Sequence, residues 1–150
     1  MKATGVVRRI DDLGRVVIPK EIRKTLRIKE GDPLEIFTDR EGQVILKKYS
    51  PIGELSEFAA GYAETLSKTT GHIACITDKD TIIAVSGGSK KEFLEQDVSK
   101  ELEQLMEDKE VYTSKENSDK AMPITKNDNN ERKNNAQIVY PIISNGDTIG

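Results

Sequence analysis

Four cationic side chains recur between residues 20 and 27 at the spacing of an α-helix. On such a helix they would fall within an arc of about 100°. These cations are Lys20, Arg23, Lys24 and Arg27. Ile22 and Leu26 fall on the opposite side, so one face can be buried while the other presents a row of positive charge. Such a row can neutralise phosphate groups, although chance also places rows of this kind on many surface helices.

Three further arginines flank a short turn that precedes this segment. Arg8 and Arg9 come before residues 11–14, and Arg15 follows them. The planar fork of an arginine can donate two parallel hydrogen bonds, which suits guanine edges in the major groove as well as phosphates. The arginines and the cationic row together favour double-stranded DNA as the partner.

Charge is distributed unevenly along the chain. The formal net charge is −3, but residues 1–50 hold 12 Lys and Arg against 8 Asp and Glu, whereas residues 51–150 hold 11 against 18. Charge that is segregated by segment usually means that the segments have different partners. The basic first segment therefore favours nucleic acid, with an ordinary solvated face as the alternative.

Groups that could support catalysis or bind a metal are few. His72 and Cys75 are the sole histidine and cysteine, and two ligands without an acidic cluster are too few for a zinc site. We expect the histidine to pack at the entry of a strand and the cysteine to act as a small buried hydrophobe. Residues 86–91 lack the spacing of a phosphate-binding loop and are predicted to form a turn before a helix, with anion binding there as the lesser alternative. No nucleophile–base pair is evident, so we predict neither an enzyme nor a cofactor.

Composition points to a protein with much solvated surface, because hydrophobic residues make up 35% and charged residues 33%. No run approaches the roughly 20 apolar residues of a membrane helix, and the N-terminus lacks the apolar core of a signal peptide. A lone cysteine cannot form an internal disulfide. We therefore predict a cytoplasmic protein, associated with the nucleoid, without membrane contact.

The first 50 residues are predicted to form short strands around one short helix. Gly14 can adopt positive φ in the turn, and Pro19 suits the first turn of a helix because its missing N–H would be unpaired there. The expected elements are strands 5–10, 15–18, 34–38 and 43–48 and a helix over 19–26.

This segment is too small to close a core by itself. About 50 residues without a disulfide or a metal lie near the lower limit for independent folding. Its apolar residues are nonetheless many: Val6, Val7, Ile10, Val16, Val17, Ile18, Ile22, Leu26, Leu34, Ile36, Val44 and Leu46. Sharing them with an identical copy would bury them and would duplicate the basic row on a two-fold face. We therefore predict a homodimer through residues 1–50.

The run VVRRIDDLGRVVIPKEIR, residues 6–23, closely resembles the AbrB-like swapped-hairpin family. The resemblance continues through Leu26, Ile28, Gly31 and Asp32, and Gly-Arg followed by apolar residues and Pro-Lys-Glu-Ile-Arg is a specific signature. It implies an intertwined dimeric β-barrel in which hairpins from two chains interleave. It also implies a sequence-specific regulator, activator or repressor, of sporulation genes in a spore-forming bacterium.

The family attributes DNA contact to arginines in these strands, this turn and this helix. By motif position the role carries over to Arg8, Arg15 and Arg23, with Arg9, Lys20 and Lys24 as helpers. Asp11 and Asp12 are expected to cap the turn, because carboxylates repel phosphates.

A different pattern follows Pro51. A helix is predicted over 54–68, with one apolar face made by Leu55, Phe58, Ala59, Tyr62 and Leu66. The other expected elements are a hairpin of strands 73–77 and 81–85, a helix over 98–106, strands 111–113 and 137–143, and a hairpin turn at 145–147. Residues 115–135, which are dominated by Asn, Lys, Asp and Glu, are predicted to form a mobile loop.

The order of these elements, with segments 71–78, 83–87 and 140–142, resembles a GAF domain, a small α/β sensory fold with an antiparallel sheet. The expected fold class is therefore α+β, with a DNA-binding domain over 1–50, a hinge over 51–55 and a GAF-like domain over 56–150. That domain is expected to be incomplete, because residues 148–150 begin a strand. The resemblance implies either sensing of a small-molecule ligand or oligomerisation, up to a tetramer.

A function of another class stays open. AbrB-type modules also occur in antitoxins, whose C-terminal part wraps a toxin and which autoregulate their operon. Such tails are usually short and disordered before binding. Residues 54–113 instead have helix and strand periodicity, which favours the regulator with a folded second domain.

Overall fold

The computed structural model describes residues 4–115, 121–128 and 136–150. The chain divides into two compact units, Met1–Tyr49 and Ser50–Gly150. In the described ranges, every helix is too short or too polar to cross a membrane.

The first unit contains a single helix and a β-hairpin. Helix α1 (Lys20–Thr25) has Pro19 as its N-cap, so it begins one residue after the predicted start, and it is followed by a left-handed residue, Arg27, with φ of 53°. The N–H of Ile28 donates to the Arg23 carbonyl at 2.8 Å, which closes the helix in a Schellman arrangement. Strands β1 (Leu34–Thr38) and β2 (Val44–Lys48) then pair antiparallel, as expected.

The predicted strands 5–10 and 15–18 do not form in the single chain. Residues 4–10 and 15–18 contain no strand. Among the described residues, the backbone bond that joins the two segments runs from the N–H of Asp11 to the carbonyl of Arg15, at 3.1 Å. An extended segment needs a neighbouring strand for its N–H and C=O groups, and the part of the chain that the structure describes pairs no strand with these residues. The expected strands therefore lack partners within one chain.

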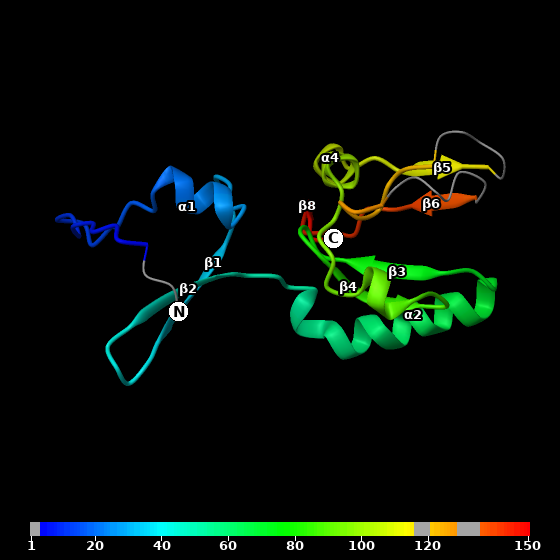
Figure 1. Cartoon of the computed structure of the whole chain (residues 1–150), viewed down its shortest axis with the longest axis horizontal. Helices are drawn as coiled ribbons and strands as arrows, with labels where there is room; N and C mark the ends of the chain where they lie inside the picture. Colours follow the sequence, from blue (N-terminus) through cyan, green and yellow to red (C-terminus); the bar gives the residue numbers. More distant parts are fainter. Residues whose placement is uncertain (1–3, 116–120, 129–135) are drawn as a thin grey trace. The chain divides into compact units, whose positions relative to one another are not determined.

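The second unit packs helices against short hairpins (Figure 1). A 3₁₀ turn, η1 (Gly53–Leu55), leads into α2 (Ser56–Thr70), which lies along the hairpin of β3 (Ala74–Thr77) and β4 (Ile82–Ser86). The remaining elements are α3 (Lys90–Phe93), α4 (Lys100–Asp108), the pair β5 (Tyr112–Ser114) and β6 (Gln137–Val139), and the pair β7 (Ile143–Ser144) and β8 (Asp147–Thr148). The whole is a mixed α+β structure.

The core of this unit consists of three small clusters. The first packs α2 on β4, the second joins β4 to α3, and the third lies under α4. Their buried members are Ala59, Ala63 and Ala84; Ile82, Val85 and Phe93; and Val98, Leu102, Leu105 and Met106. Ser99 caps α4, because its hydroxyl accepts the N–H of Leu102 at 3.0 Å.

The predicted apolar face of α2 is wrong in one respect. Ala59 is buried, and so are Ala63 and Ser67 farther along the helix. The four large side chains that were expected beside Ala59 are exposed: Leu55, Phe58, Tyr62 and Leu66. Only small residues fit where the helix lies close to β4, so the bulky ones occupy the neighbouring side of the helix.

Two other expectations need correction. Part of the predicted mobile loop is packed, because Met122 and Ile124 lie against the cluster under α4 and Thr125 is buried. The remainder, residues 116–120 and 129–135, lies outside the described residues. The predicted strand 137–143 is interrupted over residues 140–142, where Pro141 has no N–H for a ladder. The predicted turn at 145–147 is confirmed, with positive φ at Asn145 and Gly146.

Candidate nucleic-acid interface

The turn between Arg9 and Arg15 is held by one carboxylate. Oδ1 of Asp11 accepts the backbone N–H groups of Leu13 at 3.0 Å and Arg15 at 2.8 Å. Gly14 adopts φ of 74° and donates its N–H to the Asp11 carbonyl at 3.0 Å. The predicted cap is confirmed for Asp11, and so is the positive φ at Gly14. For Asp12 the predicted capping is wrong: its side chain is exposed and accepts none of the N–H groups of the turn.

The same carboxylate contacts a predicted DNA-binding side chain. Oδ2 of Asp11 accepts a hydrogen bond from Nε of Arg15 at 2.7 Å. The N–H of the Arg15 backbone, and then its side chain, hold the pKa of the Asp11 carboxyl below its ordinary value. Charged at neutral pH, Asp11 therefore ties the turn and the arginine together. This link was not predicted, although the four-residue spacing across an Asx turn is a signal that could have indicated it.

The predicted cations of α1 lie on its solvent side. Lys20, Arg23 and Lys24 are exposed. Nε of Arg23 donates to the carbonyl of Ile18 at 3.2 Å, so its guanidinium is held beside the start of the helix. Arg27 differs from the other members of the expected row, because it is half-buried in its left-handed conformation.

The three arginines before α1 are equally accessible. Arg8, Arg9 and Arg15 are exposed, like the cations of α1. Four of the six predicted DNA-binding residues fall at or beside the turn or on the first turn of α1, and Arg23 and Lys24 follow on its next turn. The carboxylate of Asp11 contacts Arg15 and offsets part of its charge. Such a surface can bind a polyanion and present arginine forks to base edges.

Most apolar side chains around these cations are exposed in a single copy of the chain. Pro19 alone is buried between residues 4 and 49. Val7 is 89% exposed, and most of the other apolar residues predicted to be shared with a second copy are also exposed; Leu13, in the turn, is 71% exposed. Exposed apolar surface on this scale is typical of an interaction surface.

The other candidate groups do not assemble into a site. His72 is exposed, so its predicted packing role is wrong: the strand it was expected to enter begins two residues later, at Ala74. Cys75 is half-buried and packs against the β4–α3 cluster, which agrees with a small hydrophobe. Within the described ranges, no three His, Cys, Asp or Glu side chains lie close enough to hold a metal. Of residues 86–91, Ser86 ends β4, residues 87–89 connect it to α3 with a bend at 87–88, and Lys90 and Lys91 begin the helix.

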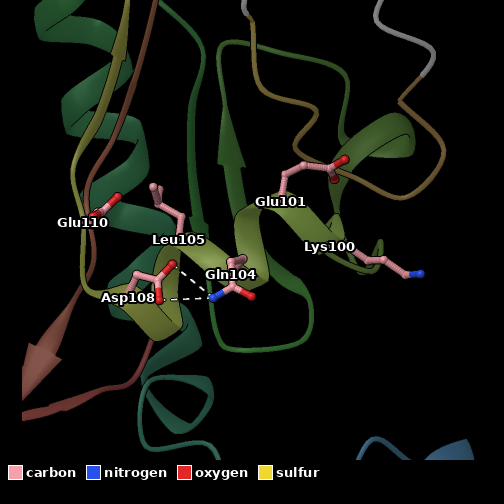
Figure 2. Close-up of a pocket in the computed structure, with 6 residues that line it drawn as sticks. All are labelled: Lys100, Glu101, Gln104, Leu105, Asp108 and Glu110. Atoms are coloured by element: carbon pink, nitrogen blue, oxygen red, sulfur yellow. Dashed lines mark hydrogen bonds between the residues drawn. The ribbon is translucent and has the colours of Figure 1, made fainter.

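A shallow hollow of about 410 Å³ lies along the outer side of α4 (Figure 2). It is lined by Lys100, Glu101, Gln104, Leu105, Asp108 and Glu110. Nε2 of Gln104 donates to both carboxylate oxygens of Asp108, at 3.1 and 3.0 Å, and is therefore occupied. Figure 2 shows five of these side chains spread along α4 and Glu110 on the segment that follows it, pointing in different directions, so no set of polar groups converges on a ligand.

Both units of the chain match known protein families. Residues 54–150 match the family "Stage V sporulation protein T C-terminal, transcription factor", and residues 7–54 match "Antidote-toxin recognition MazE, bacterial antitoxin". Stage V sporulation protein T of Bacillus subtilis (strain 168) is 55% identical over 150 residues, which are 100% of this chain and 82% of that protein. Transition state regulatory protein AbrB of the same organism is 63% identical over 51 residues, 34% of this chain and 52% of that protein. The solution structure of the N-domain of the transcription factor AbrB is 63% identical, covers 34% of this chain and 96% of that one, and has a TM-score of 0.32.

The match to the antitoxin family ends at residue 54, whereas residues 54–150 match a transcription factor family and contain the helices and hairpins of the second unit. The predicted regulator of sporulation with an AbrB-type DNA-recognition module is confirmed, and the chain is not an enzyme. Its full-length similarity and its second domain show that the chain belongs to the stage V sporulation protein T family of transcription factors.

Proposed function

We propose that two copies of residues 1–50 interleave their hairpins into one dimeric barrel that binds double-stranded DNA at specific sequences. The observation that carries the proposal is the exposure of most of the large apolar side chains in residues 4–49 next to an exposed set of cations. A second copy would supply partner strands to residues 5–10 and 15–18, whose backbone groups need them. It would also cover side chains such as Val7 and Leu13.

The proposed DNA contacts are Arg8, Arg15 and Arg23, assisted by Arg9, Lys20 and Lys24. All six are exposed and lie at the turn and on α1. A two-fold dimer presents each of them twice, which matches a palindromic operator with two half-sites. Phosphate contacts would set the register of the dimer on the duplex, and arginine forks would read bases.

For the second unit we propose oligomerisation through the exposed side of α2, which would join two dimers into a tetramer. Leu55, Phe58, Tyr62 and Leu66 form a contiguous apolar stripe there. With residues 51–55 as a hinge between the domains 1–50 and 56–150, two DNA-binding dimers could engage one duplex together and gain affinity by multivalency. A small-molecule ligand of a GAF-like fold is the second possibility, and the hollow on α4 offers no converging polar groups that favour it.

The direct test is footprinting of the full chain on genomic fragments, followed by titration of a protected duplex and a scrambled duplex of the same length and base composition. We expect the protected duplex to bind at least a thousandfold tighter, as specific regulators do. Equal affinity for the two duplexes at physiological salt would contradict sequence-specific regulation.

A further inference from the structure

Asp11 uses both carboxylate oxygens, one for the turn and one for an arginine. Oδ1 accepts the backbone N–H groups of Leu13 and Arg15, so the carboxylate cannot rotate without losing the turn. Oδ2 accepts Nε of Arg15 at 2.7 Å. The side chain of Arg15 nevertheless stays 70% exposed, against 37% for that of Asp11. The guanidinium is therefore anchored at one edge and open to solvent at the other.

This anchoring limits what Arg15 can bind. A guanidinium reads guanine through two parallel N–H donors. Because Nε is engaged by Asp11, the pair of terminal Nη groups is the edge left for a ligand. An unanchored arginine has many rotamers, and ordering them costs free energy on binding. A held arginine offers one donor geometry, which discriminates between bases.

The negative charge of Asp11 favours base reading by Arg15 but weakens the attraction of Arg15 to phosphates. A carboxylate in contact with a guanidinium offsets its positive charge, so the pair attracts a phosphate less than a lone arginine does. Arg23 provides the contrast within the same surface, because its Nε is held by the neutral carbonyl of Ile18 and its charge is not offset by that contact. Anchoring by a carboxylate suits base reading, and anchoring by a carbonyl suits phosphate binding.

We propose that Asp11 is a positioning residue that holds Arg15 to a base edge, most simply that of a guanine, so that the Asp11–Arg15 pair sets sequence specificity. The inference rests on the proposed function, because it requires Arg15 to face DNA. It adds Asp11, a residue that does not touch DNA itself, and it assigns base reading to Arg15 and phosphate binding to Arg23.

The test uses Asp11→Asn in the full chain, with Asp12→Asn as the control that removes the same charge one residue away. Asparagine retains an oxygen for the two backbone N–H groups, so the turn should persist, which circular dichroism and thermal melting check. Its amide cannot hold Nε of Arg15 as a carboxylate does. Affinities are measured for the footprinted duplex and for the scrambled duplex of equal length.

We expect Asp11→Asn to lower the ratio of specific to scrambled affinity by roughly tenfold, the scale of one lost bidentate base contact. Affinity for the scrambled duplex should hold or rise, because a negative charge has gone. Asp12→Asn should raise both affinities alike and leave the ratio unchanged. Equal changes in the two variants would mean that only charge matters, and would overturn the proposal.

A double-mutant cycle shows whether Asp11 acts through Arg15. In an Arg15→Ala background, Asp11→Asn should no longer change the specificity ratio, and a full effect there would overturn the proposal. The Arg15→Ala variant also distinguishes a failure of the proposed DNA interface from a failure of the positioning role alone. If it leaves DNA binding untouched, the proposed interface at Arg15 fails together with the positioning role. If it lowers specificity while Asp11→Asn does not, the interface stands and only the positioning role fails.

Discussion

The rings of Phe58 and Tyr62 stack on the outer side of α2, with centroids 6.1 Å apart and planes inclined by 21°. They are 69% and 54% exposed, and Leu55 and Leu66 extend the same stripe at either end. Aromatic side chains gathered on one exposed strip mark an interaction surface. Helix α2 thus has two apolar sides, one of which packs on its own hairpin while the other is exposed.

The stripe leads to a prediction about assembly. Replacing both rings, Phe58→Ser with Tyr62→Ser, should convert a tetramer into a dimer, because the substitutions remove apolar area from the proposed contact without touching the core. Analytical ultracentrifugation of the full chain measures the mass, and circular dichroism checks the fold. Glu57→Gln is the control, since helical geometry places Glu57 away from the stripe. A double variant that keeps the mass of the unaltered protein would contradict this role for α2.

The first module should be stable only as a dimer. Residues 1–55, studied alone, are expected to sediment as a dimer at every concentration at which they are folded. Their unfolding midpoint should rise with protein concentration, because dissociation accompanies unfolding. A folded monomer whose melting is independent of concentration would disprove the interleaved arrangement.

The sequence correctly located the elements whose start or turn is determined by adjacent residues. Pro19 marked the start of α1, and Asn145-Gly146 marked a tight hairpin turn. Strands 5–10 and 15–18 were not found in the single chain, since a strand depends on a partner that local sequence does not reveal. The apolar periodicity of α2 located the helix, but it could not tell the buried side from the exposed one.

The features of the candidate site likewise separate into those that local sequence predicts and those that depend on the folded turn. Residue types and spacing were enough to predict the exposed cations from Arg8 to Lys24, because charged side chains on a short helix and a turn remain in solvent. The contact between Asp11 and Arg15 depends on the geometry of the folded turn, and so does the half-burial of Arg27. Neither follows from the period of a helix.

A glycine on the α2–β4 side offers a stability test. Gly87 has φ of 76°, and a Cβ there would collide with Oγ of Ser67 and lie 3.0 Å from the carbonyl oxygen of His72. Gly87→Ala should therefore destabilise the second unit by about 1–3 kcal/mol. Gly61→Ala is the matched control, since its Cβ would meet nothing within 4 Å inside α2, and it should stabilise by about 0.5–1 kcal/mol. Urea denaturation measures both, and equal effects would contradict the packing described.

DNA binding should be sensitive to Arg8, Arg15 and Arg23. Changing any one to Ala removes two contacts per dimer and should weaken operator binding sharply without unfolding the protein. A lost phosphate contact should reduce the slope of log affinity against log salt by roughly one per contact, whereas a lost base contact should cost about 1–3 kcal/mol and relax specificity at one position of each half-site. Arg40→Ala, in the β1–β2 turn, is the control and should be nearly silent. An Arg40 effect as large as that of Arg15 would refute the proposed interface.

The last prediction concerns the carboxyl of Asp11, whose pKa is lowered first by the backbone N–H of Arg15 and then by the Arg15 side chain. Arg15→Ala removes the second cause and leaves the first, so the pKa of Asp11 should rise but remain below its ordinary value. A lowered folded-state pKa means that the turn is stabilised above the ordinary pKa and loses this stabilisation as the pH falls through the lowered one. Carboxyl ¹³C shifts can follow the titration, and the amide signals of Leu13 and Arg15 can follow the turn. The pKa of Glu64, lowered chiefly by Lys68, should not change and serves as the internal control. An Asp11 titration that is the same with and without the Arg15 side chain would show that the two groups are not coupled in solution.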